Sequence, residues 1–122
     1  MMGGFRGLKV YQLAYALSIE VFHLSKQFPK EEKFSLTDQI RRSARSVAAN
    51  IAEGYRKRSY PNHFALKMTD ADGECAETQV WLDTAKDCGY LNEDEYRNLI
   101  QRYEEVGRML NSLIQNPERF NR

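Results

Sequence analysis

Apolar residues recur along this chain at spacings of three and four, which is the period of an α-helix. The pattern predicts helices at about residues 8–27, 36–57, 61–88 and 93–115. Phe28-Pro29, Pro61 and Pro117 lie at or near the ends of these segments, where proline closes or opens a helix. Four long helices, short connections and no alternating strand pattern predict an all-α, up-down-up-down four-helix bundle. At 122 residues the chain is expected to form one domain, residues 1–122, with flexible ends at residues 1–7 and 117–122.

The second predicted helix has two distinct faces. Ser35 is expected to cap its N-terminus, with Asp38 three residues later in a short-armed form of the capping box. One face is an apolar stripe, which consists of Leu36, Ile40, Ala44, Val47 and Ile51. A second face lies about 140° around the helix and holds Arg41, Arg45 and Arg56 over a floor of Ala48, Ala49 and Ala52. The first face is therefore built for burial, and the second presents guanidinium groups.

The first predicted helix is apolar over more of its circumference than a single stripe requires. Its main stripe starts at Val10, and a second apolar set consists of Tyr11, Tyr15, Ile19 and Phe22. A helix with so wide an apolar face usually packs on two sides. In so short a chain we expect the second side to be a subunit interface, so the protein is predicted to form a homo-oligomer.

The third and fourth predicted helices carry clear packing and boundary signals. Spacings of four and three alternate along the third helix, as in a coiled-coil seam that consists of Phe64, Met68, Ala71, Cys75, Thr78, Leu82 and Ala85. Gly89 suits the position just after this helix. Asn92 and Glu95 predict a capping box at the start of the next one.

Charge is distributed unevenly, although the formal net charge is only +1. Residues 1–67 hold 12 Lys and Arg against 5 Asp and Glu, whereas residues 68–122 hold 6 against 12. The basic half is either a binding face or a partner for the acidic half, across the bundle or a subunit interface. The chain has no apolar run long enough for a transmembrane helix and no signal-peptide core at its start. We therefore expect a cytoplasmic protein that does not contact membranes.

The motifs that would carry catalysis or bind metal are incomplete. Glu20 and His23 form a Glu-x-x-His unit, but a di-metal bundle needs two such units and two further glutamates. A faint calcium-loop pattern around Asp70 and Asp72 lacks the first and last ligands. The sequence contains no nucleophile motif, phosphate loop or zinc-type cysteine pair. These observations predict a non-enzymatic protein with no cofactor and no metal.

A cluster of basic residues on and after the second predicted helix is the strongest candidate for a functional surface. It consists of Arg41, Arg42, Arg45, Arg56, Lys57, Arg58 and Lys67. The planar guanidinium of arginine suits phosphate oxygens, and such a row follows a nucleic-acid backbone without reading bases. Tyr55 and Tyr60 are close enough in sequence to stack on unpaired bases nearby. The alternative is that the cations are solvated or pair with Glu53, Asp70, Glu74 and Glu77.

Five short motifs are spread over nearly the whole chain. They are Phe28-Pro29-Lys30-Glu31-Glu32, the run Leu36–Ala44, Asn50-Ile51-Ala52-Glu53-Gly54, Gly73-Glu74-x-x-Glu77-Thr78-Gln79 and Gly89-Tyr90-Leu91. Over about residues 6–115 the sequence resembles the four-helix bundle proteins of the 23S rRNA intervening-sequence type, which are encoded within insertions in bacterial 23S rRNA genes and elsewhere. The matching positions that we take as the family motif are Asn50, Glu53, Gly54, Gly73, Glu74 and Glu77.

The resemblance implies a left-handed bundle that assembles into a ring, commonly a pentamer, with no catalytic residue. The family is also similar to the accessory variability protein of diversity-generating retroelements, a basic pentameric barrel that binds nucleic acid and a reverse transcriptase. From this likeness we expect a homopentamer. The partners that it implies are RNA or another nucleic acid, and a reverse transcriptase or another protein.

Together these observations favour a non-enzymatic, homo-oligomeric four-helix bundle that binds RNA or another nucleic acid through the basic residues of the second helix. The alternative is a structural or protein-binding scaffold that binds no nucleic acid. In the scaffold hypothesis the arginines serve ion pairs between helices and between subunits.

Overall fold

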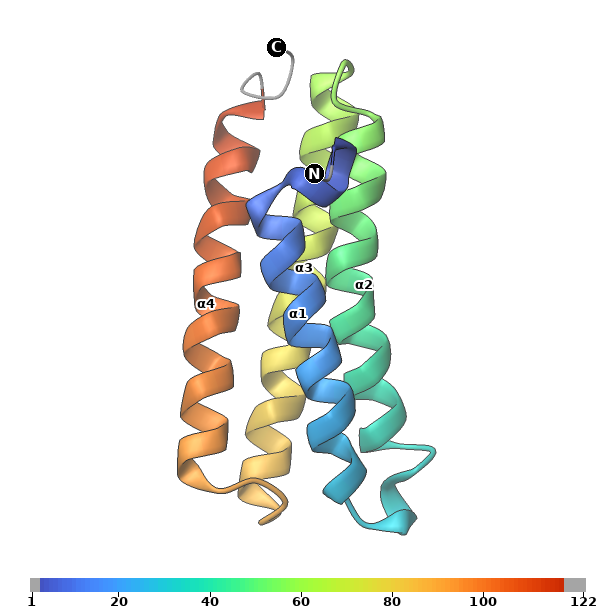
Figure 1. Cartoon of the computed structure of the whole chain (residues 1–122), viewed down its shortest axis with the longest axis vertical. Coiled ribbons are helices and arrows are strands. Elements are labelled where there is room, and N and C mark those ends of the chain that lie inside the picture. Colours follow the sequence, from blue (N-terminus) through green and yellow to red (C-terminus); the bar gives the residue numbers. More distant parts are fainter. Residues whose placement is uncertain (1–2, 118–122) are drawn as a thin grey trace.

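The computed structural model describes residues 3–117 and shows four long α-helices that run alternately up and down (Figure 1). The helices are α1 (Lys9–Leu24), α2 (Leu36–Arg56), α3 (Pro61–Asp87) and α4 (Glu93–Gln115). Short 3₁₀ turns lie at Gly4–Gly7, Ser25–Gln27 and Lys30–Glu32. Each helix packs against its neighbours in sequence, and α4 closes the bundle against α1. The predicted all-α, up-down-up-down fold is confirmed.

The core lies where the predicted apolar stripes meet. All seven residues of the α3 seam are buried, and so are the five apolar stripe residues of α2. The core is completed by α1 and α4, through Val10, Ala14, Leu17, Val21, Leu99, Tyr103, Val106, Leu110 and Leu113. Fully burying one such large apolar side chain stabilises the fold by about 1.5–3 kcal/mol. This shared core fixes which side of α2 remains on the surface.

The seam between α2 and α3 is closest at Gly54, which is buried inside α2. A Cβ atom built at Gly54 would lie 2.4 Å from Met68 Cε and 3.0 Å from Lys67 Cβ. At Gly3, Gly4, Gly73 and Gly89 such an atom would meet nothing within 4 Å, and at Gly107 its nearest neighbour would be 3.8 Å away. Gly54 is therefore needed for the spacing of these two helices.

The ends of α3 and α4 follow the sequence signals. Gly89 has φ 82°, and the N–H groups of Gly89 and Tyr90 donate to the carbonyls of Lys86 and Ala85, as in a Schellman motif. At the start of α4 the Glu95 N–H donates to Asn92 Oδ1 at 2.8 Å, and the Asn92 N–H donates to the Glu95 carboxylate at 3.0 Å. The predicted capping box is therefore confirmed.

The start of α2 differs from the prediction. Ser35 occupies the N-cap position, but its side chain accepts no hydrogen bond from the first turn. Instead the Ser35 hydroxyl donates to Glu32 Oε1 at 2.6 Å, and the Leu36 N–H donates to the same oxygen at 3.3 Å. A carboxylate is a stronger acceptor than a hydroxyl. Glu32 therefore caps the helix from the preceding turn, in the role that was expected of Ser35 with Asp38.

The expected flexible N-terminal segment, residues 1–7, contains a short 3₁₀ helix at Gly4–Gly7. The Phe5 ring packs edge-on against Tyr11 with ring centroids 5.0 Å apart, and Gln12 Nε2 donates to the Arg6 carbonyl at 2.8 Å. These contacts join Phe5 and Arg6 to the first turn of α1. At the other end the chain leaves α4 after Gln115. Residues 1, 2 and 118–122, which fall within the predicted flexible ends, lie outside the described residues.

The two connections at one end of the bundle are clasped together. Tyr90 lies in the connection between α3 and α4, and Glu32 lies in the connection between α1 and α2. Tyr90 Oη donates a hydrogen bond to Glu32 Oε2 at 2.9 Å. Gln27 Nε2 donates to the Tyr90 carbonyl at 2.9 Å, and the Phe28 and Tyr90 rings are 5.6 Å apart. The hydrogen bonds from Ser35, Tyr90 and the Leu36 N–H lower the pKa of Glu32. The same contact with Glu32 raises the pKa of Tyr90 to about 12.

We expect Glu32→Gln to lower the melting temperature at neutral pH and to have little effect in acid. The lowered pKa of Glu32 means that its stabilisation is complete above the unfolded value, about 4.3. This stabilisation is lost as the pH falls through the folded value. The two proteins should therefore melt at different temperatures at pH 7, and the gap should narrow progressively as the pH falls below the unfolded value. Circular dichroism melts across this range measure the gap, and a constant gap would contradict the role of the charge.

Cys75 is buried and Cys88 is exposed, and both are free thiols. Burial raises the pKa of Cys75 to about 11. Among the described helices, none combines the length and the apolar character that crossing a bilayer requires.

Candidate functional site

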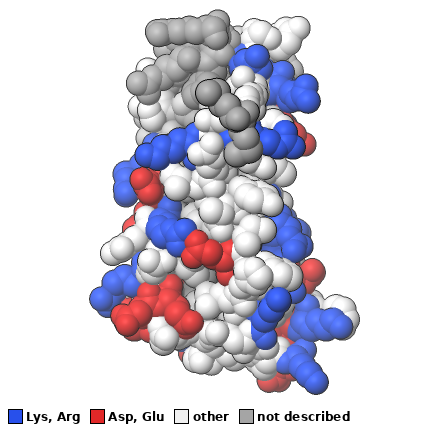
Figure 2. Space-filling view, in the orientation of Figure 1, with Lys and Arg blue, Asp and Glu red and all other residues white. Residues whose placement is uncertain are grey.

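A surface hollow of about 560 Å³ lies beside the first half of α2. We call it the basic hollow, and its lining residues are Lys33, Phe34, Thr37, Asp38, Arg41, Arg42, Arg45 and Ser46. Four cationic side chains therefore surround a single carboxylate. Figure 2 shows Lys and Arg side chains along the right edge of the molecule, over α2 and the connection before it. This is the part of the basic cluster that the fold gathers around a cavity.

An aromatic ring of α1 holds the cations near this hollow. The Phe22 ring centroid lies 4.7 Å from Arg41 Cζ, 5.8 Å from Arg45 Cζ and 4.8 Å from Lys26 Nζ. Each cation–π contact stabilises the fold by about 0.5–1 kcal/mol at an exposed site. The contacts also hold three like charges close together, and an anion would relieve their mutual repulsion.

Arg41 is anchored to α1. Its Nε donates to Ser25 Oγ at 2.7 Å, and Nη2 approaches the Phe22 carbonyl at 3.5 Å. The Ser25 hydroxyl in turn donates to the same carbonyl at 3.0 Å. A guanidinium has five N–H donors. Arg41 therefore keeps donors for a ligand while its position is fixed.

Arg45 is one helical turn further along α2 and is exposed. Its contact with the Phe22 ring is the one interaction that the structure gives it within the described residues. Lys33, which also lines the hollow, is exposed, and its ammonium lies 5.3 Å from the Phe34 ring centroid. These two cations can therefore turn toward a ligand at little cost to the fold.

Two of the predicted binding residues form ion pairs within the chain. Arg42 bridges to α3, where Nη2 contacts Glu77 Oε2 and Nη1 lies 3.5 Å from Glu74 Oε2. Lys67 on α3 pairs with Glu53 on α2 at 3.1 Å. For Arg42 and Lys67 the ion-pair alternative is the arrangement observed. Both remain partly exposed, but their charges are largely compensated.

The three cations at the C-terminal end of α2 and just after it, Arg56, Lys57 and Arg58, do not line the hollow. Arg56 is 11 residues beyond Arg45, which is about 16 Å along a helix. Arg56 and Lys57 are exposed, whereas Arg58 stacks on the Tyr55 ring at 4.1 Å and donates to the Tyr55 carbonyl at 3.1 Å. Cations at a helix C-terminus also complement the helix dipole. Of the seven predicted residues, three thus line the hollow (Arg41, Arg42 and Arg45) and four do not (Arg56, Lys57, Arg58 and Lys67).

The predicted subunit interface on α1 divides into two parts. Tyr11 and Phe22 are half-buried, and both pack within the chain, against Phe5 and against the cations of α2 respectively. Tyr15 and Ile19 are 50% and 41% exposed. The apolar surface available for a second copy is therefore centred on Tyr15 and Ile19.

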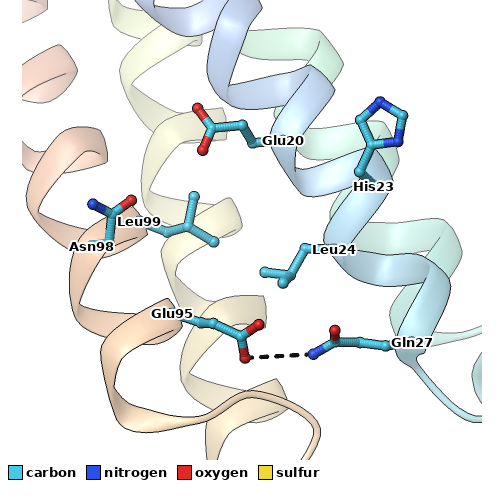
Figure 3. Close-up of a pocket in the computed structure, with 7 residues that line it drawn as sticks. All are labelled: Glu20, His23, Leu24, Gln27, Glu95, Asn98 and Leu99. Atoms are coloured by element: carbon cyan, nitrogen blue, oxygen red, sulfur yellow. Dashed lines mark hydrogen bonds between the residues drawn. The ribbon is translucent and has the colours of Figure 1, made fainter.

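A second cavity, of about 400 Å³, lies between α1 and α4 (Figure 3). Gln27 and Glu95 point toward each other across it at 3.5 Å, and the His23 ring points away. Glu20 accepts two hydrogen bonds from Arg102, one of them at 2.7 Å. Both carboxylates that line this cavity, those of Glu20 and Glu95, thus accept hydrogen bonds from other side chains of the chain. Among the described residues, no group of three or more His, Cys, Asp and Glu side chains is placed to hold a metal ion.

Comparison with known proteins connects this geometry to a family. Residues 6–112 match the family described as 23S rRNA-intervening sequence protein. The chain belongs to this family. A crystal structure of a protein of unknown function from the S23 ribosomal protein family of Bacteroides thetaiotaomicron has a TM-score of 0.80 against this chain. The two are 28% identical over 88% of this chain and 96% of that one, whereas no curated protein matches.

The residues that we assigned to the motif of the 23S rRNA-intervening sequence protein family lie along the α2–α3 seam. Glu74 and Glu77 hold Arg42, Glu53 holds Lys67, and Gly54 allows close packing, as described above. Asn50 Nδ2 donates to the Ser46 carbonyl at 2.9 Å, and Gly73 is open to solvent. Asn50, Gly73, Glu74 and Glu77 also line a shallow acidic hollow of about 500 Å³. Most of the motif residues therefore hold α2 and α3 together. None of them lines the basic hollow.

Sequence reasoning missed the lining residues Lys33, Phe34, Thr37, Asp38 and Ser46, and also Lys26 on the neighbouring Phe22 ring. Lys33 and Phe34 lie in a connection, where helical periodicity carries no information, and Lys26 lies in the turn after α1. The motif Phe28–Glu32 predicts a connection here, but it does not show which of the side chains in the connection face α2. The one available signal was the unusual Lys33-Phe34 pair, an apolar ring in a charged turn.

Proposed function

We propose that this member of the 23S rRNA-intervening sequence protein family is a non-catalytic, homo-oligomeric bundle that binds RNA through the basic hollow. The observation that supports this function is the gathering of Lys33, Arg41 and Arg45 around one cavity. These three cations have no ion-pair partner within the described residues. Arginine donors arranged in this way bind phosphate oxygens without selecting a base sequence.

RNA is the nucleic acid to test first, because the family description refers to an intervening sequence of 23S rRNA. The net charge of +1 gives a single subunit only a weak overall field. Copies of the hollow around a closed assembly would add their fields. Tyr15 and Ile19 supply exposed apolar surface for such an assembly, and the family resemblance favours a pentamer.

The test is a salt titration with a fluorescein-labelled single-stranded RNA of about 12 nucleotides. If each of the three cations contacts one phosphate, the logarithm of the binding constant should fall by about 2 for each tenfold rise in salt concentration, at about 0.7 per contact. Affinity should therefore drop about fifteenfold between about 50 and 200 mM salt. Fluorescence anisotropy measures both values. Absence of binding at low salt, or binding that salt does not weaken, would overturn the proposal.

A scaffold that binds no nucleic acid is the second candidate, and the Arg42 pairs with Glu74 and Glu77 favour it. In that case Arg42→Ala changes the assembly mass or the melting temperature, while RNA binds neither form. Light scattering and the same anisotropy assay distinguish the two functions. Both proposed functions assume a homo-oligomer, and a monomeric mass at micromolar concentration would contradict that assumption.

A further inference from the structure

Phe34 is the most exposed of the large apolar side chains in the described residues, at 86%. It lies two residues before α2 begins, on the rim of the basic hollow. The hydrogen-bonded turn around it is ordered, since Lys33 N–H donates to the Lys30 carbonyl and Ser35 N–H to the Glu32 carbonyl. The ring is therefore held in solvent by a fixed backbone.

The surroundings of Phe34 are charged. Lys33, Arg41, Arg42 and Arg45 line the same hollow, and Asp38 is its one carboxylate. An apolar protein surface docked on the ring would bury Lys33, Arg41 and Arg45, which have no ion pair within the described residues, and this is costly. A ligand that satisfies both features must offer a flat apolar face and negative charge together. A nucleotide has this combination, in its base and its phosphate.

We propose that Phe34 is a stacking platform for an unpaired base, so that the basic hollow selects single-stranded RNA over duplex RNA. This inference rests on the RNA binding proposed above and adds the class of RNA. The base stacks on the exposed face of Phe34, and the adjacent phosphates contact Arg41 and Arg45. Arg41 and Arg45 are one helical turn apart, about 6 Å, so they follow consecutive parts of one backbone.

The preference for unpaired RNA follows from the geometry of the ring. In a duplex the base faces are stacked on one another, and a side chain beside the backbone does not reach them. In a single strand each base offers a free face, and stacking on an aromatic ring tolerates any base. The hollow of about 560 Å³ is within the size range of small-ligand sites. The hydroxyls of Thr37 and Ser46 line the same space beside the cations.

The test compares Phe34→Leu and Phe34→Trp with the unmodified protein. Leucine keeps an apolar side chain but removes the ring face, and tryptophan keeps a ring. We expect Phe34→Leu to weaken binding of the single-stranded RNA about tenfold and to leave duplex binding and the salt slope unchanged. Phe34→Trp should retain the single-strand affinity. Because the side chain is 86% exposed, the melting temperature should not change in either variant.

The matched control is Leu66→Ala, which removes an apolar side chain that is 60% exposed on α3, outside the hollow. It should leave both affinities unchanged. Equal losses on single strands and duplexes in Phe34→Leu would overturn the stacking role and leave RNA binding intact. A change of assembly mass in Phe34→Leu with unchanged RNA affinity would also overturn it, in favour of a subunit contact. Absence of RNA binding by the unmodified protein would overturn both proposals.

Discussion

Reversing two charges of the basic hollow, with Lys33→Glu and Arg45→Glu together, is expected to weaken RNA binding at least about 100-fold. Both side chains are exposed and neither is in an ion pair within the described residues, so the variant should still fold, with only the small loss of their cation–π contacts. A hydrogen bond to a charged group contributes about 1.5–3 kcal/mol, and two of them correspond to at least about two powers of ten in affinity. The salt slope should also fall by about 1.4, the share of two phosphate contacts on a single strand. Anisotropy at two or more salt concentrations measures both quantities.

The matched control for this variant is the pair Arg97→Glu and Arg108→Glu on α4. It changes the net charge by the same amount, and both side chains are exposed. Arg97 pairs with Glu93 one turn away, an exposed contact that contributes only about 0.3–0.5 kcal/mol. If the α4 pair weakened RNA binding as much as the hollow pair, binding would depend on overall charge and the basic hollow would not be the site.

The helices and the core of this protein could be predicted because each depends on one segment at a time. The α3 seam from Phe64 to Ala85 repeats at spacings of four and three in the sequence, and all seven of its residues are buried. The same holds for the capping box of Asn92 and Glu95, whose two partners are three residues apart. Local spacing decides such features, so a single sequence is enough to show them.

The candidate site depends on how helices face one another, which local spacing does not contain. Arg41 and Arg42 are adjacent in sequence, yet Arg41 reaches Ser25 beside α1, whereas Arg42 reaches Glu77 on α3. A step of about 100° around α2 separates them, and the placement of α2 between α1 and α3 gives each a different partner. Phe22 shows the same limit. Its spacing placed it on an outer apolar face, but the crossing of α1 and α2 brings it under Arg41 and Arg45.

Gly54→Val is expected to cost about 2–3 kcal/mol of folding free energy, because it overfills the α2–α3 seam. The new Cβ would lie 2.4 Å from Met68 Cε and 3.0 Å from Lys67 Cβ. Met68 is fully buried, so its side chain has little space to move aside. Lys67 Cβ is fixed to the α3 backbone, so relief requires the two helices to separate. For a domain of this size the melting temperature should fall by about 10 °C.

The matched control is Gly73→Val on α3, where a Cβ meets nothing within 4 Å. Valine has a slightly better helix propensity than glycine, so this variant should keep or slightly raise the stability. Urea unfolding followed by circular dichroism gives both free energies, and the difference between the two variants isolates the cost of packing at the seam. Equal stability of Gly54→Val and Gly73→Val would contradict the close approach of α2 and α3. A large loss of stability in Gly54→Val alone would show that packing accounts for this glycine. Helix propensity does not account for it, since glycine is disfavoured in the interior of a helix.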